Sequence, residues 1–154
     1  MYNFPVSGNE DSLRDAVLEI GGRCLGLRTR MVDRAVSGVF DRAMRPYGIR
    51  ITQVSALTAV AQAGEAGPAQ LASWLYLEKS TVSRMVDRMI SAGWLEPLET
   101  QDGRSYRVRL TEAGRAKLVE VLPSWRAAQA EIEALMGEEL AARLGQLAGS
   151  LGQG

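Results

Sequence analysis

One continuous stretch, residues 78–110, combines an amphipathic helix with a two-stranded hairpin, and it constrains the fold more than any other part of the chain. Apolar residues recur at positions i, i+3, i+4, i+7 and i+8 of the segment 79–90, which predicts a helix with one buried stripe. The stripe consists of Val82, Met85, Val86, Met89 and Ile90, and the opposite side carries Thr81, Arg84, Arg88 and Ser91.

The residues before this helix predict a second helix packed against it. Leu71, Leu75 and Leu77 are spaced to pack on the buried stripe, and the small side chain of Ala72 allows a close approach between the two helices. This is the pattern of a helix-turn-helix. Tyr76 stands in the turn where glycine is often found. We therefore expect a turn that is not of the tightest kind.

The residues after the helix predict a hairpin. Gly93 can end the helix in a left-handed conformation, and the Asp102-Gly103 pair lies between the extended runs 94–100 and 105–111. An Asp-Gly pair between two such runs is a strong hairpin signal. Pro97 favours an edge position for the first strand. A helix-turn-helix followed directly by a basic hairpin is a winged helix.

The rest of the chain is expected to be helical. A long segment from Ser12 to about Arg45 is interrupted by glycines at 21, 22 and 26, and Thr52 is a candidate cap for a helix ending near Ala63. Pro68 suits a first helical turn after a loop at 64–67.

The C-terminal part predicts two further helices. Thr111 can cap a long helix that Pro123 should kink. Gly137 separates it from a last helix ending near Leu147, and residues 149–154 are expected to be frayed. The predicted fold class is mainly α (α+β): a winged helix-turn-helix core at 52–114 with long terminal helices at 12–45 and 115–147 and a two-stranded wing.

The polar side of the segment 79–91 is a candidate surface for double-stranded DNA. Short hydroxyl side chains can approach base edges and phosphates, and arginine can bind guanine through two hydrogen bonds or hold a phosphate. An ordinary solvated helix face is the alternative for this helix taken alone. The candidate DNA-binding residues are Lys79, Ser80, Thr81, Ser83, Arg84 and Arg88 on the helix and Asp102, Arg104 and Arg107 on the wing.

The chain resembles the MarR family of bacterial transcriptional regulators over roughly residues 13–147. The resemblance is carried by Leu71-Ala72, the run 79–89, Gly93-Trp94-Leu95, Asp102-Gly103-Arg104 and the run 108–114, with 47–53 similar to the entry into an upstream helix. It implies a homodimeric DNA-binding regulator, and the two wing residues Asp102 and Arg104 match an Asp-x-Arg motif of the family. We expect a repressor that is released by a small aromatic or anionic ligand.

A dimer would also cover the apolar residues of the terminal helices, which exceed what a small winged helix can bury. They are Leu13, Val17 and Ile20 at one end and Ile132, Leu135, Met136, Leu140, Leu144 and Leu147 at the other. Packing within one subunit is the alternative. A two-fold dimer would place two recognition helices roughly 34–36 Å apart, suited to a near-palindromic operator.

Two further functions follow from the resemblance. It places an effector site between the dimer helices and the DNA-binding region, with candidates Arg28, Met31, Val32, Tyr47, Leu57 and Trp125. Some members of the family sense peroxide through a cysteine in the first helix, and Cys24 lies near Arg23 and Arg28, which can lower a thiol pKa. Each of these residues could instead be a plain core or surface residue. A winged helix that binds acidic protein partners is a competing function.

Composition excludes several classes of protein. The chain has no histidine and one cysteine, which removes the common catalytic triads, zinc knuckles and intramolecular disulfides. We therefore expect no enzyme activity, metal or cofactor. Eighteen basic and eighteen acidic residues give a net charge of zero, so DNA affinity must come from local charge. No apolar run is long enough to span a bilayer and no signal peptide is recognisable, so we expect a cytoplasmic protein without membrane contact.

Overall fold

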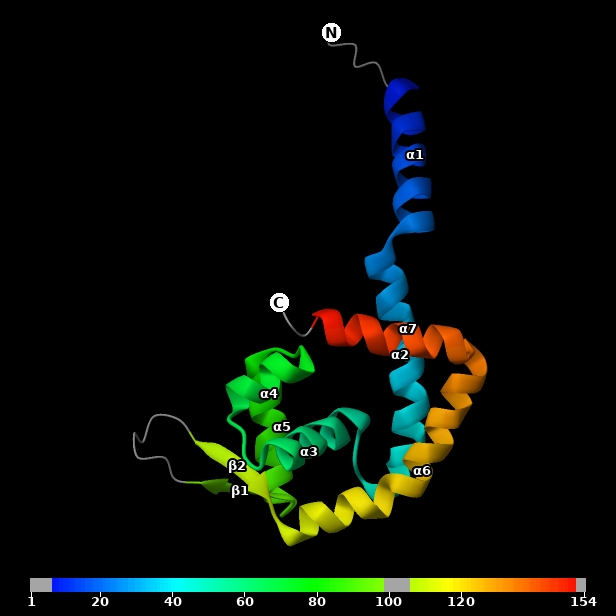
Figure 1. The fold of residues 1–154 in the computed structure, drawn as a ribbon. Helices are drawn as coiled ribbons and strands as arrows, with labels where there is room; N and C mark the ends of the chain where they lie inside the picture. The colour runs from blue at the N-terminus through cyan, green and yellow to red at the C-terminus, as the bar shows by residue number, and fades with distance from the viewer. Residues whose placement is uncertain (1–6, 99–105, 152–154) are drawn as a thin grey trace. The chain divides into compact units, whose positions relative to one another are not determined.

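The computed structural model describes residues 7–98 and 106–151, which form a largely helical chain with one two-stranded sheet (Figure 1). The chain divides into two compact units, residues 1–38 and residues 39–154. The predicted Asp102-Gly103 turn and the predicted role of Arg104 concern residues outside the described ranges. The predicted class, mainly α with a winged helix-turn-helix, is confirmed.

The first unit contains helix α1 (Ser7–Arg23) and the first part of helix α2 (Leu25–Met44). The break between them falls at Cys24, within the run of glycines that predicted an interruption. Backbone bonds bridge it, because the Cys24 N–H donates to the Ile20 carbonyl at 2.9 Å. Leu13, Val17 and Ile20 are exposed in this unit.

The second unit begins with the end of α2, the 3-10 turn η1 (Arg45–Tyr47) and helix α3 (Ile51–Ala63). The expected cap at Thr52 was wrong by two residues, since Arg50 is the N-cap of α3. Two side-chain acceptors, one in the first turn of α3 and one on α2, explain the earlier start. The Gln53 side chain accepts from the Arg50 N–H at 3.0 Å, and the Asp41 carboxylate accepts from the Ile51 N–H at 2.9 Å.

Helix α4 (Pro68–Leu75) and helix α5 (Lys79–Ser91) form the predicted helix-turn-helix. Tyr76 adopts the left-handed conformation at φ 52°, which glycine usually provides in this position. The turn therefore has the backbone conformation of a glycine turn, although its residue is a tyrosine. Four of the five predicted stripe residues of α5 are buried, and Ile90 is half-buried. They share one core with Leu71, Ala72 and Leu57. Burial of this apolar side leaves the polar side of α5 outward.

Strands β1 (Leu95–Leu98) and β2 (Arg107–Leu110) pair antiparallel, with Leu95 opposite Leu110 and Pro97 opposite Val108. On its other side Val108 exchanges two backbone hydrogen bonds with Ala66, at 2.9 and 3.0 Å. Strand β2 therefore lies between β1 and the loop after α3, and β1 is an edge, as Pro97 predicted.

Helix α6 (Glu112–Met136) begins at the predicted cap, where the Thr111 hydroxyl accepts from the Gly114 N–H at 3.0 Å. The helix continues through Pro123, and Figure 1 shows it bending where its colour passes from yellow to orange, the part that contains this proline. Gly137 ends α6, and helix α7 (Glu138–Leu151) follows. It runs four residues beyond the predicted end at Leu147, so the start of the expected frayed tail is helical.

The start of α6 is held directly against the turn that follows α5. The Thr111 hydroxyl donates to the Gly93 carbonyl at 2.5 Å, and the Thr111 N–H donates to the Trp94 carbonyl at 3.1 Å. A side-chain carbon at Gly114 would overlap the Trp94 carbonyl oxygen and would press on Leu110. Only glycine permits this approach, so Gly114 sets how α6 leaves the winged helix.

We expect Gly114→Ala to destabilise the protein by about 1–3 kcal/mol, because backbone atoms must move to accept one methyl group. Denaturant unfolding measures this change. Gly145→Ala on α7 is the matched control, since no atom lies within 4 Å of its added carbon. The control should gain about 0.5–1 kcal/mol from helix propensity. Equal stability of the two variants would contradict the tight approach.

Candidate nucleic-acid interface

The outward side of α5 presents the predicted polar residues. Lys79, Ser80, Thr81, Arg84 and Arg88 are all exposed. Ser83 differs from them, because it is half-buried and its hydroxyl donates to the Lys79 carbonyl at 3.0 Å. The helix therefore offers two guanidinium groups and the short hydroxyls of Ser80 and Thr81 along one side, with Lys79 exposed in its first turn and its apolar side fixed in the core.

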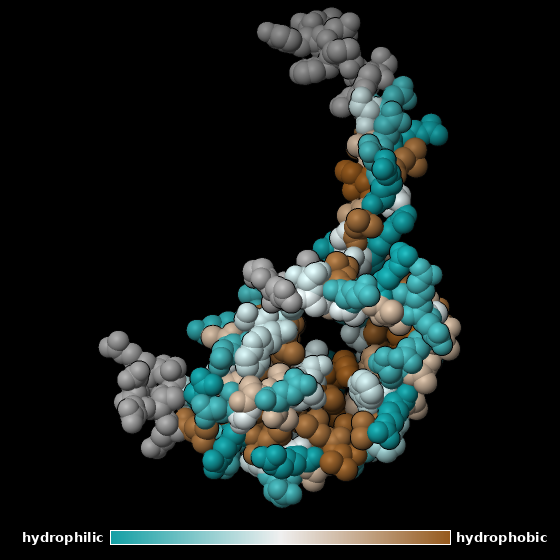
Figure 2. Space-filling view, viewed as in Figure 1, coloured by the Kyte–Doolittle hydropathy of each residue, from teal (hydrophilic) through white to brown (hydrophobic). Residues whose placement is uncertain are grey.

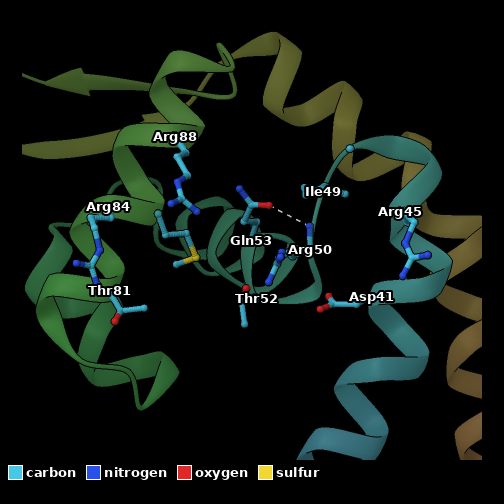
Figure 3. A pocket seen from close by; sticks show the side chains of 11 residues that line it. Asp41, Arg45, Ile49, Arg50, Thr52, Gln53, Thr81, Arg84 and Arg88 are labelled. Atoms are coloured by element: carbon cyan, nitrogen blue, oxygen red, sulfur yellow. Dashed lines mark hydrogen bonds between the residues drawn. The ribbon is translucent and has the colours of Figure 1, made fainter.

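Beside this helix face lies a cleft with a volume of about 690 Å³. Figure 3 shows Arg84, Arg88 and Thr81 on α5 at one wall and Asp41 and Arg45 at the other, with Arg50, Thr52 and Gln53 between them. Gly48, Ile49 and Met85 complete the lining.

The second wall of the cleft is built by the turn between α2 and α3. Gly48 at φ 68° closes the turn η1 in a conformation that suits glycine. This brings Arg45, in η1, and Arg50, the N-cap of α3, to the same opening. The Arg50 N–H is held by Gln53, and Asp41 is held by the Ile51 N–H. The polar backbone atoms at the start of α3 are thus satisfied while the guanidinium groups remain outward.

The cleft carries four guanidinium groups and one carboxylate. Among the described residues none of these four arginines forms an ion pair, whereas Arg107 and Arg109 on β2 each lie beside a glutamate. Converging cations with few counter-charges create a positive potential that attracts anions. The arrangement suits phosphate groups, which arginine binds with paired hydrogen bonds.

Sequence reasoning found only the α5 wall of this cleft. Arg45, Arg50, Thr52 and Gln53 were not among the predicted site residues, although 47–53 was noted as similar to a family segment. Their separation from Arg84 by more than thirty positions gives no periodic signal. The available signal was two arginines on either side of the Tyr47-Gly48 turn, directly before a helix start.

Two arginines of strand β2, at the base of the wing, form ion pairs with glutamates on either side of the strand. The Arg107 Nε is buried 2.7 Å from the Glu65 carboxylate, aligned as an ion pair rather than as a hydrogen bond, and its Nη2 donates to the Glu65 carbonyl at 3.2 Å. The Arg109 Nε donates to Glu96 at 2.6 Å. Arg107 is therefore engaged with the protein, and its predicted contact with DNA stays a prediction. Asp102 and Arg104 lie outside the described residues.

A second contact joins the wing base to α5. The Tyr106 hydroxyl donates to the Asp87 carboxylate at 3.5 Å. Burial raises the pKa of Tyr106, and the neighbouring negative charge of Asp87 and this hydrogen bond raise it further. The hydroxyl therefore keeps its proton, and with it the link to α5, at neutral pH.

A second cavity of about 610 Å³ lies between α3 and α6 and is mostly apolar. Figure 2 shows hydrophobic side chains, in brown, gathered in the lower part of the molecule where Figure 1 places these helices. Its lining contains no charged side chain. The lining residues are Ile51, Val54, Ser55, Thr58, Ala59, Gln62, Leu118, Val119, Val121, Leu122 and Trp125.

Of the predicted effector residues, only Trp125 lines this cavity. Leu57 is fully buried in the core, and the Tyr47 hydroxyl lies 2.7 Å from the Ser124 hydroxyl. Arg28, Met31 and Val32 belong to the first unit and are exposed there, and the Arg28 guanidinium donates to the Gly22 carbonyl.

Cys24 is half-exposed at the break between α1 and α2, and its sulfur accepts from the Leu27 N–H at 3.4 Å. Its predicted redox role is not tested by this geometry. Within the described ranges, no three side chains of His, Cys, Asp or Glu gather as a metal site. Nor does any helix there have the length and apolar character needed to cross a membrane.

Comparison with known proteins gives consistent results. Residues 49–106 match the sequence profile of the MarR family. The multiple antibiotic resistance protein MarR of Salmonella typhimurium is 31% identical over 93 residues, which are 60% of this chain and 65% of that protein. The regulator PecS of Dickeya dadantii is 28% identical over 96 residues, 60% of this chain and 55% of that protein. The chain thus aligns with less than two thirds of these relatives' length.

Solved structures extend the similarity over most of the chain. The M. tuberculosis transcriptional regulator MosR, in complex with DNA, is 32% identical with a TM-score of 0.73, covering 85% of this chain and 95% of that one. A cysteine-to-serine mutant of MarR from E. coli, complexed with operator DNA, has a TM-score of 0.74 at 24% identity, covering 87% of this chain and 97% of that one. Because its sequence identity is only 24%, the similarity to this MarR mutant is evidence for the fold alone.

Proposed function

The chain belongs to the MarR family, and we propose that it is a sequence-specific DNA-binding transcriptional regulator acting as a homodimer. The observation that carries the proposal is the cleft of four arginines beside the exposed face of α5, none of which forms an ion pair with a described residue. MosR, the relative of similar length, was solved with DNA. We predict a cytoplasmic location, because a transcriptional regulator needs access to the chromosome.

In this proposal α5 lies in the major groove, which accommodates one helix. Its exposed residues then have different roles according to their position along the helix. Arg84 lies in the middle of the polar side, where a guanidinium can bind the acceptor pair of a guanine. Ser80 and Thr81, at the start of the helix, are short enough to let the backbone approach the bases.

The far wall of the cleft holds the DNA backbone. Arg45 and Arg50 belong to a turn and a helix start beside α5, so they would meet phosphates at the edge of the groove rather than base edges. Contacts of this kind fix the register of the protein on DNA without reading its sequence. Arg84 and Arg50 should therefore contribute to binding in different ways, although both line one cleft.

We expect Arg84→Ala to lose about 1–3 kcal/mol on the preferred operator and to relax the choice of base at one position in each half-site. Arg50→Gln should weaken binding to all sequences to a similar extent and should lower the salt slope by about one. Gel-shift titrations on operator and scrambled DNA at several salt concentrations measure both effects.

Arg143→Gln on α7 is the matched control, because that arginine is exposed and paired with Glu139 away from the cleft. It should bind DNA as the parent protein does. If the parent protein bound no DNA from its own upstream region, the competing function, binding of acidic protein partners, would gain support. Unchanged DNA affinity in both cleft variants would rule out the cleft as the interface.

The dimer is proposed from the apolar surface of the terminal helices. Leu140, Leu144 and Leu147 repeat at helical spacing along α7 and are exposed in the single chain, as are Leu13 and Val17 on α1. Exposed apolar stripes of this kind mark interaction surfaces. A dimer would cover them and would hold two α5 helices roughly 34–36 Å apart, one DNA turn.

Truncation after Gly137 removes α7 and its apolar stripe. We expect light scattering to show loss of the dimer, and operator affinity to fall by about 10²-fold or more because two half-sites are no longer bound together. The matched control replaces only the exposed charged residues Glu139 and Arg143 with glutamine and should remain dimeric. A truncated chain that stays dimeric would exclude α7 from the interface.

We further propose that the cavity between α3 and α6 binds the effector that releases the protein from DNA. The absence of charge in its lining favours a neutral aromatic or apolar ligand. This narrows the sequence-based expectation of an aromatic or anionic ligand. Such a ligand would act by separating α3, which carries one wall of the arginine cleft, from α6.

Nitrobenzene and 4-nitrobenzoate test the cavity, since they share a ring that quenches tryptophan and differ in charge. We expect nitrobenzene to quench the parent protein more strongly at equal concentration, and Trp125→Phe to lose most of that difference. Ala59→Leu should fill part of the cavity and weaken the quenching while DNA binding persists. Preference for the benzoate would contradict a neutral effector.

A further inference from the structure

Tyr76 occupies a backbone conformation that favours glycine. Its φ of 52° and ψ of 42° lie in the left-handed region, and it is the only non-glycine residue with positive φ among those described. The turn itself needs this conformation, because the Tyr76 N–H bonds to the Ala72 and Ser73 carbonyls and the Leu77 N–H bonds to the Ala72 carbonyl at 3.0 Å. Those bonds use backbone atoms alone, so any residue that tolerates the conformation can make them.

The side chain of Tyr76 does little for the fold. It is 70% exposed, and it makes no hydrogen bond to any described residue. Glycine would therefore form the same turn with less strain. A strained residue with an exposed ring, next to a functional surface, points to a role for the ring outside the fold.

The ring lies beside the proposed DNA interface. Tyr76 lines a shallow hollow of about 550 Å³ together with Ser73, Leu77, Glu78 and Thr81. Thr81 also lines the arginine cleft, so the hollow and the cleft adjoin at the start of α5. A duplex that fills the cleft would pass over the hollow as well.

We propose that the Tyr76 ring packs against a deoxyribose of the DNA backbone at the edge of the major groove occupied by α5. The inference rests on the proposed function and adds a contact to it. The carboxylate of Glu78, which lines the hollow, repels phosphate, whereas a sugar is uncharged and its carbon atoms suit an aromatic face. The contact adds affinity without reading a base.

The substitution Tyr76→Gly removes the aromatic ring but keeps the backbone conformation of the turn. Because glycine suits the conformation, the thermal midpoint should stay at or above that of the parent protein. Affinity for operator and for scrambled DNA should both fall, by about five- to tenfold, the size of one good contact. A change that keeps stability and lowers affinity is not expected of a merely structural residue.

Two further variants complete the test. Tyr76→Asn, which also tolerates the left-handed region, should behave as the glycine variant. Tyr76→Phe should keep the parent affinity within about twofold, because the ring and not the hydroxyl makes the contact. Titrations use the full-length protein, with Arg84→Ala as a reference for loss of sequence reading.

The outcomes separate this inference from the proposed function. Parent protein that binds DNA, with a glycine variant that binds equally well, overturns the role of Tyr76 and leaves the function intact. A loss confined to the operator would mean that the ring reads a base and would overturn the sugar contact. A loss in the phenylalanine variant equal to that in the glycine variant would assign the contact to the hydroxyl. Parent protein that binds no DNA overturns both proposals.

Discussion

Burial of one side of α5 is the interaction on which the rest of the structure depends. Val82, Val86 and Met89 are fully buried, and they share a core with residues from α3, α4 and both strands. Each buried aliphatic side chain of this kind contributes about 1.5–3 kcal/mol relative to an exposed one. Rotation of α5 about its axis would expose these side chains, so the core fixes which residues the helix presents to a partner.

A second set of contacts orients α5 relative to α6, beside the buried Val121 that α6 contributes to the same core. Gly93 ends α5, and the Thr111 side chain joins the Gly93 carbonyl to the start of α6. Lys117, one turn further, reaches the Tyr47 carbonyl at 3.3 Å and lies over the Trp94 ring. Movement of α6 would consequently be transmitted to both the end of α5 and the turn before α3. The proposed effector cavity, walled by α6, lies where such a movement could be driven.

Local patterns predicted the elements of the fold because the signals lie within one element. The spacing of Val82, Met85 and Met89 predicted the buried side of α5, and Thr111 predicted the cap of α6. The start of α3 was wrong because the acceptor that fixes it, Asp41, lies ten residues upstream on another helix. Arg45 and Arg50 were missed for the same reason, since only the folded turn brings them beside Arg84. The engagement of Arg107 with Glu65 depends on a contact across forty-two positions, beyond any periodic pattern.

The pairing of Ala66 with Val108 limits how the chain can vary in length. Both backbone bonds between these residues must form at once, and Val108 is at the same time the partner of Pro97. The length of the loop from Gly64 to Gly67, between α3 and α4, is therefore constrained by this pairing. One added residue there would turn the Ala66 bonds away from β2 or carry Glu65 away from Arg107. Surface loops usually tolerate insertions, but relatives that lengthen this one would need a compensating change in the wing.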